Sequence, residues 1–211
     1  MIGEVIRLYV DRADFFLKLT GQHIRISATA ISIAIILGLT IGILISRRKK
    51  LATTVIGVIN VAYTIPSISM LGFLIPLTGI GDKTAIIALS IYGLLPMVRN
   101  TYTGITNIEP AILEAAKGMG STGWQMLTRI QLPLALPVIV AGIRSMVVMT
   151  IALSGISSFI GAGGLGVAIY RGITTNSTKM TVAGSILIAL LAILADTMIA
   201  FLERRLRRHR G

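Results

Sequence analysis

The chain has 211 residues, a formal net charge of +12, no cysteine and 54% apolar residues. Charged residues make up 13% of it, roughly half the share that is typical of soluble domains. This composition argues against a soluble enzyme and a disordered chain, and it indicates a membrane protein with several spans. The lack of cysteine excludes disulfides, thiol catalysis and cysteine metal sites.

Five stretches are apolar enough to cross a bilayer as helices, since such a helix needs roughly 20 mostly apolar residues. In chain order these predicted spans are 26–45, 51–77, 84–105, 134–159 and 180–202. Pro66 interrupts the second span and Pro96 the third. No alternation of period two is present, which argues against a barrel.

The basic residues predict the orientation. Arg47, Arg48, Lys49 and Lys50 directly follow the first span, and an arginine cluster follows the fifth. Because positive residues beside spans stay in the cytoplasm, five spans place the N-terminus outside, the C-terminus in the cytoplasm and residues 99–132 inside. A nucleic-acid interpretation exists for the arginine cluster, but its position straight after a span favours anchoring and contact with anionic lipids.

The N-terminal segment 1–25 is predicted to stay outside the bilayer. Residues 3–19 mix apolar side chains with charges of both signs, which fits an amphipathic helix on the outer surface as well as a frayed leader. The first span does not resemble a cleaved signal peptide, because its positive block follows the apolar run. Residues 26–203 are the predicted transmembrane domain, and residues 204–211 are a basic cytoplasmic tail.

Residues 109–133, called the hairpin segment below, carry the strongest local signals. Pro110 suits the first turn of a helix, and Gly118 and Gly120 can end that helix, because glycine accepts the left-handed conformation. Thr122 and Gln125 have the spacing of a capping box that opens a second helix. The segment therefore predicts two short helices at a sharp angle between the third and fourth spans.

Apolar side chains gather on one side of each short helix, at spacings of three and four residues. They are Ile112, Ala115, Ala116 and Met119 on the first helix, and Trp124, Leu127 and Ile130 on the second. These faces either pack on the protein's own helix ends or form a knob that docks into a groove of a soluble partner. The residues alone leave both interpretations open.

The hairpin segment resembles the EAA signature of ATP-binding-cassette (ABC) importer permeases. That signature is Glu-Ala-Ala, three residues, Gly, nine residues, Ile, any residue and Leu-Pro. Here it reads Glu114, Ala115, Ala116, Gly120, Ile130, Leu132 and Pro133. The resemblance implies the all-α type I permease fold, with coupling helices at about 109–130 held in a cleft of the ATP-hydrolysing subunit. It makes the seven motif residues and Trp124 the candidates for coupling. The predicted topology independently places this segment inside, where ATP is.

Two further motifs are similar to those of permeases for glycine betaine, carnitine and choline. They are TIPS at 64–67 and the glycine-rich FIGAGGLG at 159–166, which resembles an outer loop of that group. The resemblance implies uptake of a quaternary-ammonium osmoprotectant. The nearest alternative is a permease for methionine or another small solute, because methionine-type permeases share the fold and carry similar glycines. A standalone channel or secondary carrier is the remote alternative.

The resemblance also implies a complex in the bacterial cell membrane. Two permeases, identical copies or paralogues, would surround a central path, with two ATPase subunits that bind ATP and Mg inside and a substrate-binding protein outside. The chain itself is expected to be no enzyme and to hold no cofactor or metal. It has no phosphate-binding Gly-Lys-Ser/Thr loop and only two distant histidines, His23 and His209. We expect the chain to contact the lipid bilayer and not nucleic acid.

The candidate translocation path comes from the proline-interrupted spans, since broken helices often line paths, with a packing kink as the alternative. Its residues are Tyr63, Pro66, Ser67, Ser69, Met70, Tyr92 and Arg144. Aromatic faces attract quaternary ammonium ions, but aromatic residues make up only 5% of the chain. We therefore expect a weak passage rather than a binding cage.

Arg144 and Asp196 are costly in lipid and should face the protein interior or a cavity. Their estimated depths differ, which disfavours a direct pair. In the outer loop, the candidates for a re-entrant loop or gate are Gly161, Gly163, Gly164 and Gly166. A plain flexible turn is the alternative there.

Overall fold

The computed structural model describes residues 2–208, and no β-strand occurs in that range. Its helices are α1 (Ile2–Asp11), α2 (Ala13–Ser46), α3 (Lys49–Thr64), α4 (Ser67–Thr78), α5 (Asp82–Thr106), α6 (Pro110–Gly118), α7 (Gly123–Gln125), α8 (Leu132–Ser154), α9 (Gly166–Thr174) and α10 (Thr178–Arg208). A π-helical turn, η1 (Met126–Gln131), joins α7 to α8, and a 3-10 turn, η2 (Ile156–Ile160), follows α8. The all-α class predicted from the sequence is confirmed.

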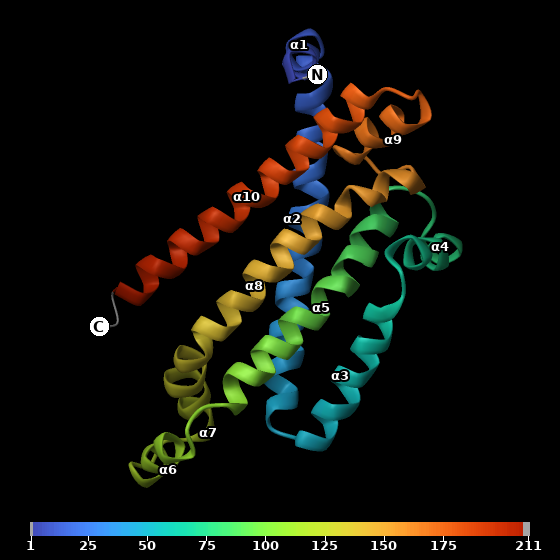
Figure 1. The fold of residues 1–211 in the computed structure, drawn as a ribbon. Coiled ribbons are helices and arrows are strands. Elements are labelled where there is room, and N and C mark those ends of the chain that lie inside the picture. Colours follow the sequence, from blue (N-terminus) through green and yellow to red (C-terminus); the bar gives the residue numbers. More distant parts are fainter. Residues whose placement is uncertain (1, 209–211) are drawn as a thin grey trace.

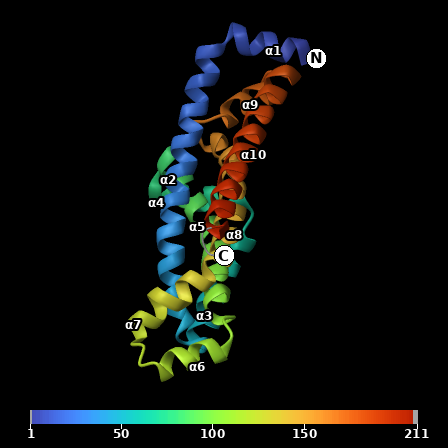
Figure 2. The same cartoon turned by 90° about the vertical axis from the view of Figure 1, so that its left-hand side faces the viewer.

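The long helices α2, α5 and α8 run side by side, with α3 and α4 on one flank and α10 on the other (Figure 1). One end of the bundle carries α6 and α7, and the opposite end carries α1 and α9. Helix α1 lies across that second end (Figure 2). There the Tyr9 hydroxyl donates to the Ala183 carbonyl of α10 at 2.8 Å, and burial raises the pKa of Tyr9.

Small residues let α2 and α5 approach closely. Ala30, Ala34, Gly38 and Gly42 are buried and recur every fourth position, so they form one stripe along α2. A Cβ atom added at Gly42 would lie 2.5 Å from the Thr101 Cβ of α5. Such stripes are typical of helix pairs packed in membranes, where close backbone contact replaces the hydrophobic driving force.

Three helical segments are long and apolar enough to cross a membrane: Ala13–Ser46, Gly123–Ser154 and Thr178–Phe201. The pair α3 and α4 would make a fourth, bent by 100° at its break. Helix α5 is not among them, although its 25 residues span about 37 Å. It is buried at 13 of those 25 positions, so neighbouring helices, not lipid, surround much of it. The predicted count of five spans stays a prediction.

Several boundaries differ from those predicted. Helix α2 starts at Ala13 and runs unbroken into the first span, so residues 1–25 hold α1 and the beginning of α2. The fourth predicted span, 134–159, corresponds to α8, which ends earlier, at Ser154, because Gly155 and η2 follow it. The last helix continues to Arg208, and the predicted tail residues 209–211 lie outside the described residues. The basic turn at 47–50 lies at the same end of the bundle as the hairpin segment (Figure 1).

Candidate functional site

The first arm of the hairpin segment is α6, which begins at Pro110 as predicted. Beyond it, Gly120 has a φ of +80°. Its N–H donates to the Lys117 carbonyl at 2.9 Å, and the Ser121 N–H donates to the Ala116 carbonyl at 3.1 Å. These two bonds form a Schellman motif, whose left-handed residue is normally glycine. Of the two glycines predicted to end this helix, Gly120 takes the left-handed position, whereas Gly118 is the last residue of α6.

The second arm opens with the predicted capping box. The Gln125 N–H donates to the Thr122 hydroxyl at 3.3 Å, and the Thr122 N–H donates to the Gln125 side-chain oxygen at 2.9 Å. The expected separate short helix is wrong, however, because the helix continues to Ser154. Pro133 should break it, but the π turn carries the helix across: the Leu132 N–H donates to Leu127, five residues back.

Some apolar side chains of the hairpin segment are buried, and others are exposed at its tip. Met119 and Trp124 are 80% and 70% exposed, and Ile112 is 41% exposed. Ala116 and Leu127 were expected on the same two faces, but both are buried. Each face therefore packs partly on the chain itself and leaves one large apolar side chain free at the turn.

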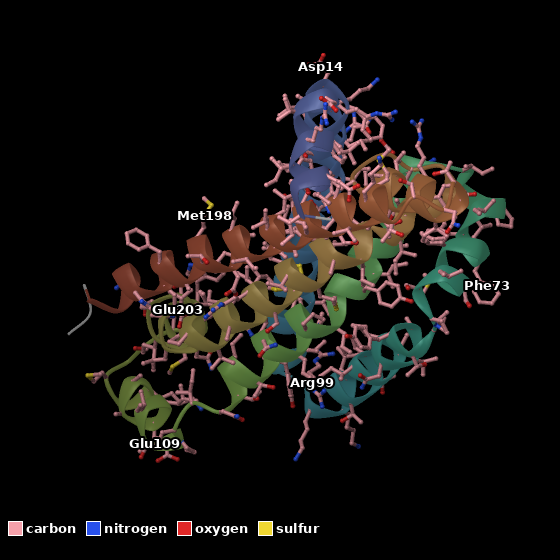
Figure 3. All side chains as sticks on the ribbon, turned by 45° about the horizontal axis from the view of Figure 1, so that its top comes forward. Asp14, Phe73, Arg99, Glu109, Met198 and Glu203 are labelled. Carbon is pink, nitrogen blue, oxygen red and sulfur yellow. The ribbon has the colours of Figure 1, made fainter. Side chains whose placement is uncertain are left out.

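The remaining motif residues surround this turn. Glu114 and Ala115 are exposed, and Ile130, Leu132 and Pro133 are half-buried. Glu114 makes no ion pair within residues 2–208. Glu109 lies at the far tip of the molecule (Figure 3). A hollow of about 340 Å³ beside Gly120 is lined by Met119, Ser121, Gln125, Arg129 and Ile130.

The broken second span is fixed by hydrogen bonds from aromatic residues. Ile65 and Pro66 are extended between α3 and α4, and the Tyr92 hydroxyl of α5 donates to the Ile65 carbonyl. The rings of Tyr63 and Tyr92 meet edge to face at 5.9 Å. The Tyr63 hydroxyl also lies 3.4 Å from the Met149 sulfur of α8.

The structure brings only part of the candidate path together. Tyr63, Pro66 and Ser69 are exposed near the break and Ser67 is half-buried, whereas Met70 and Tyr92 are buried in the chain's own core. Arg144 lies elsewhere, on the side of α8 that faces α10. The candidate residues of α3 and α4 therefore lie together at the break, and Arg144 does not lie among them.

Arg144 and Asp196 form a two-pronged ion pair between α8 and α10, so the expectation that they do not pair is wrong. The Arg144 Nη2 donates to Asp196 Oδ2 at 2.7 Å, and its Nε donates to Oδ1. Glu203, further along α10, lines the same open hollow of about 510 Å³ (Figure 3). The pair ties the last helix to the helix that begins in the hairpin segment.

The glycine-rich loop is held by polar contacts from two helices. Gly161 and Gly164 have φ values of +76° and +98°. The Gly163 N–H donates to Asp82 Oδ1 at 2.9 Å, and the Gly164 N–H donates to the Gln22 side-chain oxygen at 3.2 Å. These bonds hold the loop against α5 and α2, and its role as a re-entrant loop or gate stays a prediction.

Sequence reasoning missed Gln22 and Asp82, which anchor this loop, and their polar neighbours Arg25 and His23. Arg25 forms an ion pair with Asp82. His23 is 1% exposed, and its Nε2 lies 3.0 Å from the Ile151 carbonyl and 2.8 Å from the Ser154 hydroxyl. Their signal was their position: Arg25 and His23 directly precede the first predicted span, and Asp82 precedes the third. Polar residues at span ends on the side of the loop could have been grouped with it.

The described residues hold no group of three or more His, Asp or Glu that could bind a metal ion. An apolar tip at one end and an anchored loop at the other are joined by the continuous helix 123–154.

Comparison with known proteins gives a consistent picture. A family model described as "Binding-protein-dependent transport system inner membrane component" matches residues 34–208. The chain is 42% identical over 206 residues to the carnitine transport permease protein OpuCD of Listeria monocytogenes, covering 97% of this chain and 92% of that protein. It is 43% identical over 205 residues to the osmoprotectant import permease protein OsmW of Salmonella typhimurium, covering 95% of each chain. It is 41% identical to the glycine betaine/carnitine/choline permease protein OpuCB of Bacillus subtilis, covering 88% and 86%.

Solved structures share the fold at lower identity. An inward-facing structure of the MetNI methionine ABC transporter matches with a TM-score of 0.82 and 24% identity, covering 90% of this chain and 95% of that chain. An amino acid ABC transporter with histidines matches with a TM-score of 0.78 and 19% identity, covering 93% and 96%. At this identity these likenesses support the fold alone.

Proposed function

The chain belongs to the family of binding-protein-dependent transport system inner membrane components, and we propose that it is the permease subunit of an ABC importer for a quaternary-ammonium osmoprotectant. The observation that carries the substrate class is the set of relatives, 41–43% identical over most of both chains, that are named for carnitine, glycine betaine, choline or osmoprotectants. The chain contributes a path, while partner ATPase subunits bind ATP and Mg.

The hairpin segment is the proposed contact with the ATPase. Its turn is fixed by the Schellman motif at Gly120 and the capping box at Thr122, and it presents Met119 and Trp124 to the surroundings. A fixed turn with free apolar side chains suits insertion into a groove. Closure of the ATPase dimer on ATP would draw two such segments together, because ATP favours the closed arrangement by differential contacts. The exposed Glu114 would either meet a basic residue of the ATPase or cap its own loop.

The proposed topology has five spans in the cell membrane, with α5 as the third, the N-terminus outside and the C-terminus in the cytoplasm. Residues 1–25 form the outer segment, 26–203 the transmembrane domain and 204–211 the basic tail. Two features support this orientation: the basic turn 47–50 and the hairpin segment share one end of the bundle (Figure 1), and positive charges stay inside.

The path is proposed to run along the break between α3 and α4, between this chain and a second permease. Tyr63, Pro66 and Ser69 are exposed there, and a backbone without helical hydrogen bonds at a break is tolerated where it lines a cavity. The Tyr63 ring offers a weak cation–π contact to a trimethylammonium group. Arg144 is better explained as the α8–α10 tie than as part of this path, since both prongs of its guanidinium are engaged.

Uptake measurements test this function. The chain, with its cognate ATPase and binding protein, is expressed in cells that lack their own osmoprotectant uptake. We expect energy-dependent accumulation of labelled glycine betaine, carnitine or choline, and none of methionine. Accumulation of methionine alone would contradict the substrate class, and accumulation without the ATPase would contradict the permease role.

A further inference from the structure

A hollow of about 460 Å³ opens at the end of the bundle opposite the hairpin segment. It lies between α2, the start of α5, the glycine-rich loop and α9. Its polar lining consists of Lys18, Gln22, Asp82, Gly163 and Arg171. In the proposed topology this hollow faces the outside of the cell.

The acceptor groups of the hollow are already engaged. Asp82 pairs with Arg25 and accepts the Gly163 N–H at 2.9 Å. The Gln22 side-chain oxygen accepts the N–H of Gly164 at 3.2 Å. Each oxygen of Asp82 and the Gln22 side-chain oxygen thus already accepts one hydrogen bond from the protein.

Within residues 2–208, the cations of the hollow have no carboxylate partner. Lys18 and Arg171 are both exposed, and neither makes an ion pair within residues 2–208. Arg171 lies over the Phe15 ring, with its guanidinium carbon 5.3 Å from the ring centre, which holds it at the rim. Two unpaired cations on α2 and α9 thus face a hollow that is closed below by the glycine-rich loop.

We propose that this hollow receives an acidic side chain of the extracytoplasmic binding protein, held between Lys18 and Arg171. The inference rests on the proposed function and orientation. Charge complementarity indicates a carboxylate, which would satisfy both cations, whereas they would repel the trimethylammonium group of the solute. The hollow lies on the face where the binding protein docks in the proposed function, so we assign the carboxylate to that partner. Docking here places the partner directly on the loop that Asp82 and Gln22 anchor, at the outer ends of α5 and α2.

The experiment measures binding of the binding protein to the permease–ATPase complex in nanodiscs. Lys18→Glu and Arg171→Glu are compared with Lys179→Glu, a matched reversal of an exposed lysine that does not line the hollow. Arg171→Lys serves as the conservative variant. Basal ATPase activity without binding protein reports that each complex is folded. Titration at two salt concentrations then separates a specific ion pair between the two proteins from long-range electrostatic attraction, which salt screens.

We expect Lys18→Glu and Arg171→Glu to raise the Kd at least tenfold, which corresponds to about 1.4 kcal/mol. Lys179→Glu should stay within twofold and Arg171→Lys should bind nearly as well as the wild type. A lysine replacement of the matching acidic residue on the binding protein should restore binding to Arg171→Glu. Equal weakening by all three reversals would overturn the proposal, and so would unchanged binding with an altered lipid dependence, which would assign the hollow to a lipid phosphate. A wild-type complex that binds no binding protein would instead overturn the proposed function.

Discussion

Replacing Gly120 separates the backbone of the hairpin turn from its side-chain contacts. A Cβ atom at Gly120 would meet no heavy atom within 4 Å, so the cost of a side chain comes from its φ of +80° alone. A left-handed conformation costs an L-residue about 1–2 kcal/mol, which lowers the ratio of the native turn to its alternatives about 5–30-fold. We expect Gly120→Leu to insert and fold normally, and to lower uptake by up to that factor because the exposed tip is misplaced.

The assay is uptake of labelled substrate together with ATPase activity of the reconstituted complex. Gly120→Asn should retain more transport than Gly120→Leu, because asparagine tolerates the left-handed region. Gly118→Ala is the matched control: it also meets no atom within 4 Å, but it lies in α6, where alanine is favoured. Wild-type uptake by Gly120→Leu would refute the coupling role. Equal losses for Asn and Leu would refute the argument from φ.

Three further results are expected. Gly42→Val should lower the melting temperature of the purified protein, because a Cβ there would lie 2.5 Å from a side-chain carbon of α5 and overpacking costs about 1–3 kcal/mol. The control Gly57→Val should leave the melting temperature unchanged, because a Cβ at Gly57 meets no atom within 4 Å. Equal shifts for the two variants would contradict close packing of α2 on α5. Arg144→Asp and Asp196→Arg should each lower the melting temperature and recover part of it in combination, and a swap without recovery would argue against the pair. Docking of α1, followed by a spin label on a cysteine introduced there, should weaken as pH rises past the ordinary tyrosine pKa. Burial raises the pKa of Tyr9, so its stabilisation is complete below the unfolded pKa and lost through the folded one; Tyr9→Phe should remove this dependence.

The hairpin segment could be predicted closely because its signals are local. Pro110, Gly120 and the Thr122–Gln125 box act over a few residues, and the structure places each as expected. The failure was at Pro133, where the residue type predicts a break. A π turn that shifts the hydrogen bonds by one residue leaves no trace in hydropathy, so the continuous helix could not be read from the sequence.

The ion pair between α8 and α10 shows how an error in helix ends affects depth. From the predicted spans, Arg144 lies ten residues and Asp196 six residues from the ends on the hairpin side. Within the described residues the last helix continues to Arg208, so Asp196 lies at least 12 positions from its end. This is close to the ten positions that separate Arg144 from the predicted start of its span. Hydropathy marks only where the apolar residues end, whereas α10 continues as a helix beyond that point. The sequence therefore underestimated the depth of Asp196 and disfavoured its pairing with Arg144.

The continuous helix 123–154 links the two ends of the molecule mechanically. Its 32 residues span about 48 Å, from the exposed Trp124 to Ser154, whose hydroxyl lies 2.8 Å from His23 beside the glycine-rich loop. A displacement of the hairpin segment must either tilt this whole helix or be absorbed within it. The π turn at Met126–Gln131 is the place for absorption, because its hydrogen bonds depart from the α-helical pattern and π turns are often functional sites. Beyond it, α8 packs on α5 and is tied to α10 by Arg144, so it moves with both. In the proposed function, ATPase closure at the tip therefore reaches the outer loop through one helix and two packed neighbours.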